Sequence, residues 1–145
     1  MAPIQLSPHF SLDEMIRTKV DLPNQPGDRE ISNMQMLCVK VLEPLRLKLR
    51  KPIHVSSGFR SPAVNKAVGG VPSSHHVLGC AADIQVDGMS PDDVVAALRS
   101  IPGIRWTQLI REPSWVHVSY VVGNLKCETL RAIGTPEKGY TYTKL

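Results

Sequence analysis

Apolar residues follow helical spacing in the first half of the chain and short, strand-like runs in the second half. The longest helical stripe spans residues 31–49, and Pro44 within it predicts a kink or a division of that helix. Ser11 and Glu14 have the spacing of a capping box, which predicts a short helix after Ser11. Further elements are expected as helices at 61–68 and 90–100, and as strands at 53–56, 81–86, 106–111, 115–122 and 126–132.

The order of these elements, helices first and strands later, predicts an α+β fold with a small antiparallel sheet covered by helices on one face. The 145 residues suit a single domain, 1–145, without repeats or linkers. We expect its core to lie at about 10–132 and the polar segment 133–145 to be a loose tail.

Composition places the chain among ordinary globular proteins, with 42% hydrophobic and 21% charged residues. The net charge of +4 favours contact with anionic polymers, but Lys and Arg are not clustered as they are in nucleic-acid-binding proteins. The scattered cysteines do not form a disulfide framework, and we expect free, buried thiols at Cys38, Cys80 and Cys127.

The N-terminal segment shows no basic region followed by an apolar run, so a secretory signal is not expected. No apolar stretch approaches the ~20 residues that span a bilayer. We therefore expect a protein made in the cytoplasm, which another component must release if its substrate lies outside.

Histidines and one aspartate form a candidate metal site. His75 and His76 precede a segment of small residues that ends at Asp83 on an expected strand. A loop-to-strand reversal would bring one of the two histidines back to that carboxylate. His117, on an alternating strand that also carries Trp115, is the candidate third ligand. Imidazole and carboxylate donors suit zinc and also several harder metals.

Three protein ligands leave one position for water, the pattern of a catalytic zinc site. Such a metal lowers the pKa of its water toward ~7 and polarises a carbonyl, and the reaction needs a general base nearby. Glu112 lies five residues before His117, across the Pro113–Ser114 connection, and a short turn would fold it toward the metal. The alternative interpretation of Glu112 is a solvated carboxylate at the end of a strand.

Three motifs occur in order over most of the chain, from about residue 10 to about residue 120: SSGFRSP at 56–62, SHHVLGCAAD at 74–83 and WVH at 115–117. With them the chain resembles the zinc D-Ala-D-Ala carboxypeptidase and phage endolysin family of peptidoglycan metallopeptidases, whose fold is shared with the hedgehog signalling domain. The resemblance implies one Zn²⁺ per chain, a peptidoglycan stem peptide as substrate, and a monomer without nucleic acid or stable membrane association.

The resemblance also implies roles for individual residues. His76, Asp83 and His117 correspond to the zinc ligands, and the spacing to Asp83 favours His76 over His75. Arg60 corresponds to an arginine that binds a substrate carboxylate or the developing oxyanion.

Other positions correspond to the cleft around the metal. Ser74 matches a serine that lines it, and Glu112 matches the acidic base, although many relatives place that carboxylate where Ser114 stands here. Trp115 occupies the place of a histidine found in several relatives. We place Trp115 on the cleft wall, where it binds substrate and leaves more charge stabilisation to Arg60.

The expected function is hydrolysis of a peptide bond in bacterial peptidoglycan, with release by a phage-type holin or as part of a virion. The alternative is a non-catalytic zinc domain that binds wall fragments or a protein partner. The sequence leaves three bonds open: those cut by D-Ala-D-Ala carboxypeptidases, by L-Ala-D-Glu endopeptidases and by cross-bridge endopeptidases.

Overall fold

A computed structural model describes residues 4–145 and has the α+β architecture that the sequence predicts. The helical elements are α1 (Leu12–Ile16), α2 (Asp28–Leu37), η1 (Cys38–Leu42), α3 (Glu43–Leu49), α4 (Pro62–Ala67) and α5 (Pro91–Arg99). The strands are β1 (Gln5–Ser7), β2 (Phe10–Ser11), β3 (His54–Ser57), β4 (Ala81–Gln85), β5 (Gln108–Arg111), β6 (Val116–Ser119), β7 (Glu128–Thr135) and β8 (Gly139–Lys144). Within residues 4–145, no helix has the length and apolar character needed to cross a membrane.

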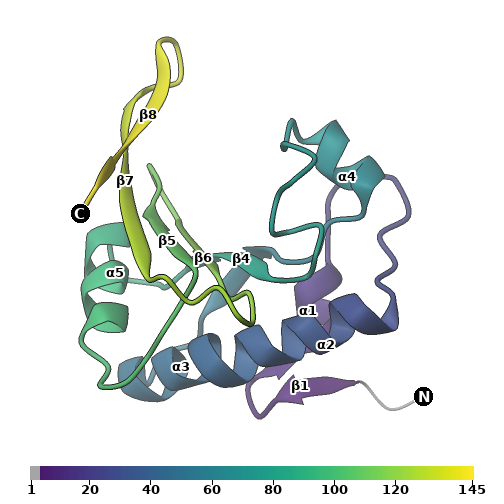
Figure 1. Ribbon diagram of the computed structural model, residues 1–145, viewed down its shortest axis with the longest axis horizontal. Helices are drawn as coiled ribbons and strands as arrows, with labels where there is room; N and C mark the ends of the chain where they lie inside the picture. Colours follow the sequence, from purple (N-terminus) through teal and green to yellow (C-terminus); the bar gives the residue numbers. More distant parts are fainter. Residues whose placement is uncertain (1–3) are drawn as a thin grey trace.

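The strands form a two-stranded sheet, β1–β2, and a six-stranded sheet with the order β3-β4-β6-β5-β7-β8. Neighbours in the larger sheet are antiparallel except β5 and β7, which run parallel. Figure 1 shows the long helix made of α2, η1 and α3 below this sheet, with α5 beside β5 and β7. The predicted antiparallel sheet is therefore present, with one parallel pair inserted in it.

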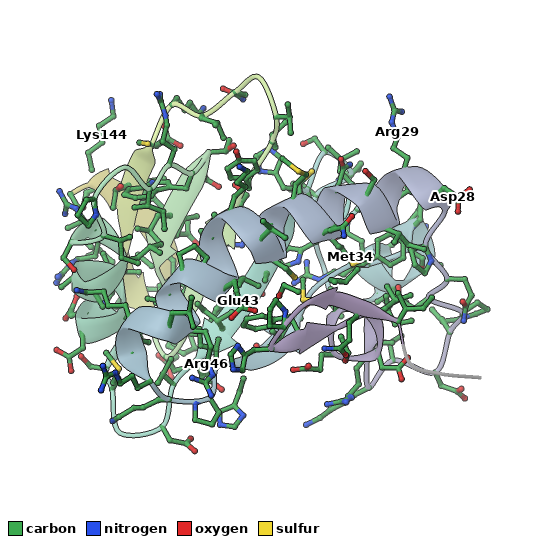
Figure 2. All side chains as sticks on the ribbon, turned by 90° about the horizontal axis from the view of Figure 1, so that it is seen from below. Asp28, Arg29, Met34, Glu43, Arg46 and Lys144 are labelled. Atoms are coloured by element: carbon green, nitrogen blue, oxygen red, sulfur yellow. The ribbon has the colours of Figure 1, made fainter. Side chains whose placement is uncertain are left out.

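The stripe predicted at 31–49 forms one continuous helical rod, which begins earlier, at Asp28 (Figures 1 and 2). Pro44 neither ends the rod nor splits it. The π-helical segment η1 precedes the proline, and the N–H of Glu43 donates to the carbonyl of Cys38, five residues back. Because proline has no N–H and crowds the carbonyl four residues earlier, this wider turn accommodates the ring.

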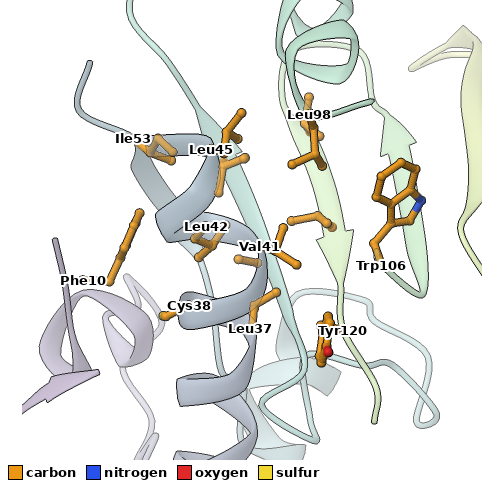
Figure 3. Packing of buried hydrophobic residues seen from close by; sticks show 14 of the residues in the cluster. Phe10, Leu37, Cys38, Val41, Leu42, Leu45, Ile53, Leu98, Trp106 and Tyr120 are labelled. Atoms are coloured by element: carbon orange, nitrogen blue, oxygen red, sulfur yellow. The ribbon is translucent and has the colours of Figure 1, made fainter. Parts of the chain in front are cut away.

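The core lies between this rod, α5 and the central strands. Figure 3 shows Val41 and Leu45 of the rod on the side facing Leu98 of α5, with Leu37 further along the rod, and all four side chains are fully buried. Burial of each such side chain contributes about 2 kcal/mol to stability. This packing holds the sheet in a fixed position relative to the rod.

The cysteines are free thiols, as predicted, and Cys38 and Cys80 are buried, but Cys127 is only half-buried, contrary to the prediction. Burial raises the pKa of Cys38 to about 12 and that of Cys80 to about 11. Both thiols therefore stay protonated and unreactive near neutral pH.

The C-terminal segment differs from the sequence prediction. Residues 133–145 are not a loose tail, because β7 continues through Thr135 and β8 pairs with it in an antiparallel hairpin (Figure 1). The strand predicted at 126–132 is consequently not the last one. The alternating Tyr and Thr residues at 140–143 have high strand propensity, and their exposure explains why polarity alone suggested a tail.

A buried carboxylate joins the N-terminal hairpin to the rod. Glu43 accepts hydrogen bonds from the Ser7 hydroxyl at 2.8 Å, from the His9 backbone N–H at 2.9 Å and from His9 Nδ1 at 2.6 Å. Burial alone would raise the pKa of Glu43, but the bonds from His9 and Ser7 lower it below its ordinary value. The carboxylate is therefore ionised at neutral pH, and both of its oxygens accept hydrogen bonds.

Replacing Glu43 by alanine should lower the free energy of unfolding by about 2 kcal/mol at pH 7, because the buried Ser7 hydroxyl and the two His9 donors lose their acceptor. A lowered folded-state pKa stabilises the protein fully above the ordinary carboxyl pKa and loses that effect as pH falls through the folded value. Urea unfolding should therefore show a smaller difference between the two proteins at about pH 3 than at pH 7. Glu137→Ala, at an exposed position, is the control, and equal effects of both substitutions would contradict this role for Glu43.

Candidate active site

The centre of the site is a pair of opposed residues on neighbouring strands. Asp83 of β4 and His117 of β6 are direct partners in the antiparallel register. Cross-strand partners point to the same face of a sheet, and Nδ1 of His117 lies 3.0 Å from Oδ1 of Asp83. The alternating pattern of the β6 segment therefore directs His117 at this carboxylate.

His76 approaches the same oxygen from the loop that precedes β4. Its Nε2 lies 3.3 Å from Oδ1 of Asp83, and its side chain is almost fully buried. Its other ring nitrogen, Nδ1, lies 2.7 Å from the carbonyl oxygen of Gly58. Because a carbonyl can only accept, Nδ1 carries the proton and Nε2 keeps its lone pair for a metal.

The segment after β3 forms hydrogen bonds with both the ring and the backbone of His76. The Gly58 carbonyl receives the ring N–H, and the backbone N–H of Arg60 donates to the carbonyl of His76 at 3.0 Å. A side chain at Gly58 would place its Cβ 2.3 Å from the carbonyl oxygen of Met15. Only glycine allows the segment to pass α1 so closely, which gives a physical reason for Gly58 in the SSGFRSP motif.

The three donors suit a zinc ion. One donor atom from each of His76, Asp83 and His117 lies within 4.8 Å of the others, and His75 is not part of the group. Burial alone would raise the pKa of Asp83, but the neighbouring imidazoles of His117 and His76 hold it well below its ordinary range. The carboxylate is therefore ionised, as metal ligation requires. Two imidazoles and one carboxylate form a donor set of the catalytic zinc type.

Arg60 lies against the outer oxygen of this carboxylate. Its guanidinium donates to Oδ2 of Asp83 at 3.4 Å, to the Ser57 hydroxyl at 3.0 Å and to Oδ1 of Asn65 at 3.3 Å. Asn65 is itself buried and donates to the carbonyl of Val71 at 2.8 Å. These contacts hold the guanidinium in one orientation, and its remaining N–H groups have no protein partner within residues 4–145.

An open cleft of about 600 Å³ surrounds these groups. All seven residues that the sequence singles out line it: Arg60, Ser74, His76, Asp83, Glu112, Trp115 and His117. The tight connection after β5 closes with a hydrogen bond of 3.0 Å from the Glu112 N–H to the Trp115 carbonyl, and so turns both side chains into the cleft. The structure thus brings the predicted residues together, and their individual roles stay predictions.

Tyr142 is a residue of the cleft that the sequence did not reveal. Its hydroxyl donates to Oε1 of Glu112 at 3.2 Å, and its ring lines the cleft. Burial raises the pKa of Glu112, and the bond from Tyr142 opposes that rise. The alternation of Tyr and Thr between Gly139 and Lys144 was the available signal, because it is typical of a strand.

Gly79 shapes the loop that carries His76. Its φ is +75°, and an added Cβ would lie 2.5 Å from the carbonyl oxygen of Glu30. Gly103 has the same φ, with nothing within 4 Å of a Cβ. Both Gly→Ala substitutions should therefore cost about 1 kcal/mol of backbone strain, but only Gly79→Ala must displace the loop.

We expect Gly79→Ala to weaken zinc binding about tenfold or more, whereas Gly103→Ala leaves it unchanged. Competition with a chromophoric chelator measures both affinities, and thermal unfolding checks that both variants are folded. Equal zinc affinities for the two variants would show that the loop does not depend on Gly79.

Comparison with known protein families agrees with the geometry of the site. No curated protein matches the chain. The sequence model of the Peptidase M15 family matches residues 8–119, more than half of the chain, and this range contains His76, Asp83, His117 and Glu112. The match confirms the resemblance carried by the three motifs, and the chain belongs to the peptidase M15 family of zinc metallopeptidases.

Proposed function

We propose that this protein hydrolyses a peptide bond in bacterial peptidoglycan, with the stem peptide as its substrate. The observation that carries the proposal is the convergence of the donors of His76, Asp83 and His117 in one open cleft that also contains Glu112 and Arg60. The family supplies peptidase chemistry, and the net charge of +4 suits an anionic wall.

His76, Asp83 and His117 would hold the zinc ion through Nε2, a carboxylate oxygen and Nδ1. When bound, zinc supplies an activated water and polarises the scissile carbonyl. The Gly58 carbonyl keeps His76 in the tautomer that can bind a metal.

Glu112 acts as the general base in this proposal. Its carboxylate takes a proton from the attacking water and passes it to the nitrogen of the leaving amine. The short turn to Trp115 places Glu112 on the wall of the cleft, and burial raises its pKa toward that of an effective base.

Arg60 binds a negatively charged group of the substrate in this proposal. The guanidinium N–H groups that have no partner among the described residues can bind a carboxylate of the stem peptide or the oxyanion that develops at the scissile carbonyl. Ser74 and Trp115 also line the cleft. With this substrate, the proposed site of action is the cell wall.

Zinc removal is the first test. Dialysis of the protein against a chelator should abolish the clearing of a suspension of purified peptidoglycan, and added Zn²⁺ should restore it. His117→Ala should remain inactive after zinc is added, because a ligand is lost. Mass spectrometry of the released fragments identifies the bond, since a carboxypeptidase frees D-Ala and an endopeptidase divides the stem or the cross-bridge. A zinc-loaded protein that releases no fragment would overturn the proposal and favour a non-catalytic wall-binding domain.

Replacement of Glu112 by glutamine should lower kcat about 100-fold or more and leave zinc content unchanged, because the amide cannot accept the proton. Glu128→Gln is the matched control. Glu128 is also a half-buried carboxylate, which accepts from Gln108 at 2.9 Å but lies outside the cleft, and its replacement should leave kcat unchanged. Full activity of the Glu112 variant would rule out its role as the base.

A further inference from the structure

The β7–β8 hairpin forms part of the cleft but lies outside residues 8–119, the range that matches the family. Figure 1 shows the hairpin rising from the sheet beside β5 and extending beyond the body of the protein. All six residues of β8 are exposed, so core packing does not explain the presence of this strand. One of its side chains, Tyr142, nevertheless lines the cleft.

The position of Tyr142 is set by the sheet. β7 is registered in parallel with β5, and Ala132 of β7 pairs with Tyr142 of β8. Asp92 of α5 ties β5 and β7 together, because it accepts from Arg111 at 3.2 Å and from Arg131 at 2.9 Å. Since Glu112 directly follows β5, this ladder brings the tyrosine hydroxyl to the carboxylate from β8, which is separated from β5 by β7.

We propose that Tyr142 is a positioning residue, whose hydroxyl holds the Glu112 carboxylate in the orientation in which it accepts a proton from the attacking water. The proposal rests on the proposed function, since it needs Glu112 to be the general base. The hydroxyl donates to Oε1 at 3.2 Å, while Oε2 has no protein partner within residues 4–145. One carboxylate oxygen is therefore anchored and the other faces the cleft.

Glu112 needs such an anchor because its own segment provides none for the carboxylate. The residue lies at a turn whose next two positions, Pro113 and Ser114, are exposed. Backbone hydrogen bonds fix its main chain, but within residues 4–145 Tyr142 gives the only hydrogen bond to its side chain. A long, unanchored carboxylate would sample several rotamers, and a base must lie within hydrogen-bonding reach of its proton.

The same bond also favours the ionised carboxylate. The charged or titratable groups around Glu112 are Tyr142 on β8, His117 on β6, Asp83 on β4 and Arg111 on β5. Burial raises the pKa of Glu112, while the bond from Tyr142 and the charge of His117 lower it and Asp83 raises it. Loss of the hydroxyl should therefore raise the pKa of the base and move the acid limb of the pH profile of kcat to higher pH.

Tyr140 offers a matched control on the same strand. It lies two residues before Tyr142, on the same face of β8, and is opposite Gly134 in the register. Tyr140 does not line the cleft, and within residues 4–145 its hydroxyl has no hydrogen-bond partner. Replacing either tyrosine by phenylalanine removes one hydroxyl and keeps the ring, so the strand should form in both variants.

The experiment compares the zinc-loaded native protein with Tyr142→Phe and Tyr140→Phe, with soluble peptidoglycan fragments that carry stem peptides as substrate. For Tyr142→Phe we expect kcat to fall about tenfold, the value of one hydrogen bond to a charged group, and KM to change less than about twofold. The acid limb should move to higher pH in this variant alone. Tyr140→Phe should match the native protein, and zinc content and melting temperature should be the same for all three.

Two results would overturn the role of Tyr142 alone. The first is a Tyr142→Phe protein as active as Tyr140→Phe, and the second is a loss confined to KM, which would make the hydroxyl a substrate contact. A native protein that hydrolyses no peptidoglycan fragment would overturn the proposed function and this role together, so the two failures are distinguishable.

Discussion

The pairing of Asp83 with His117 across the β4–β6 ladder is the constraint on which the rest of the site depends. Two residues far apart in the chain become fixed neighbours because they occupy opposite positions in an antiparallel register. A slip of one residue would turn one of them to the other face of the sheet. The buried faces of β4 and β6, packed on the helical rod, hold the register, so the hydrophobic core determines how these two candidate ligands face each other.

The third candidate ligand, His76, depends on a different constraint, the close approach of the backbone at Gly58 to α1. Gly58 passes within contact of α1 and offers its carbonyl to His76, while Arg60 binds the same loop through its backbone and the Asp83 carboxylate through its side chain. The SSGFRSP segment therefore supports two of the candidate metal ligands, His76 and Asp83, directly. The segment therefore connects α1 in the N-terminal half to the sheet, through its contacts with His76 and Asp83.

The sequence predicted the α+β class, most element positions and the residues of the cleft, because these follow from periodicity and motif spacing. The effect of Pro44 was not predictable in the same way, since a local rule forbids the α-helical bond but does not show that a π-helical turn replaces it. The β7–β8 hairpin was missed because its side chains are exposed and its stability comes from the backbone ladder to β7. Tyr142 was missed with it, since its contact with Glu112 depends on a parallel pairing of distant strands.

The place of β8 at the outer edge of the sheet has a consequence for how activity responds to heat. An exposed edge hairpin opens locally at lower free-energy cost than the packed central strands, so its amides exchange with solvent earlier than those of β4 and β6. Asp83 and His117 on the central strands are insulated from such opening, whereas the contact of Tyr142 with Glu112 is not. Under the proposed roles of Glu112 and Tyr142, an opened hairpin would remove the contact between them while the rest of the fold stays intact, and inactivation by heat would begin below the unfolding transition.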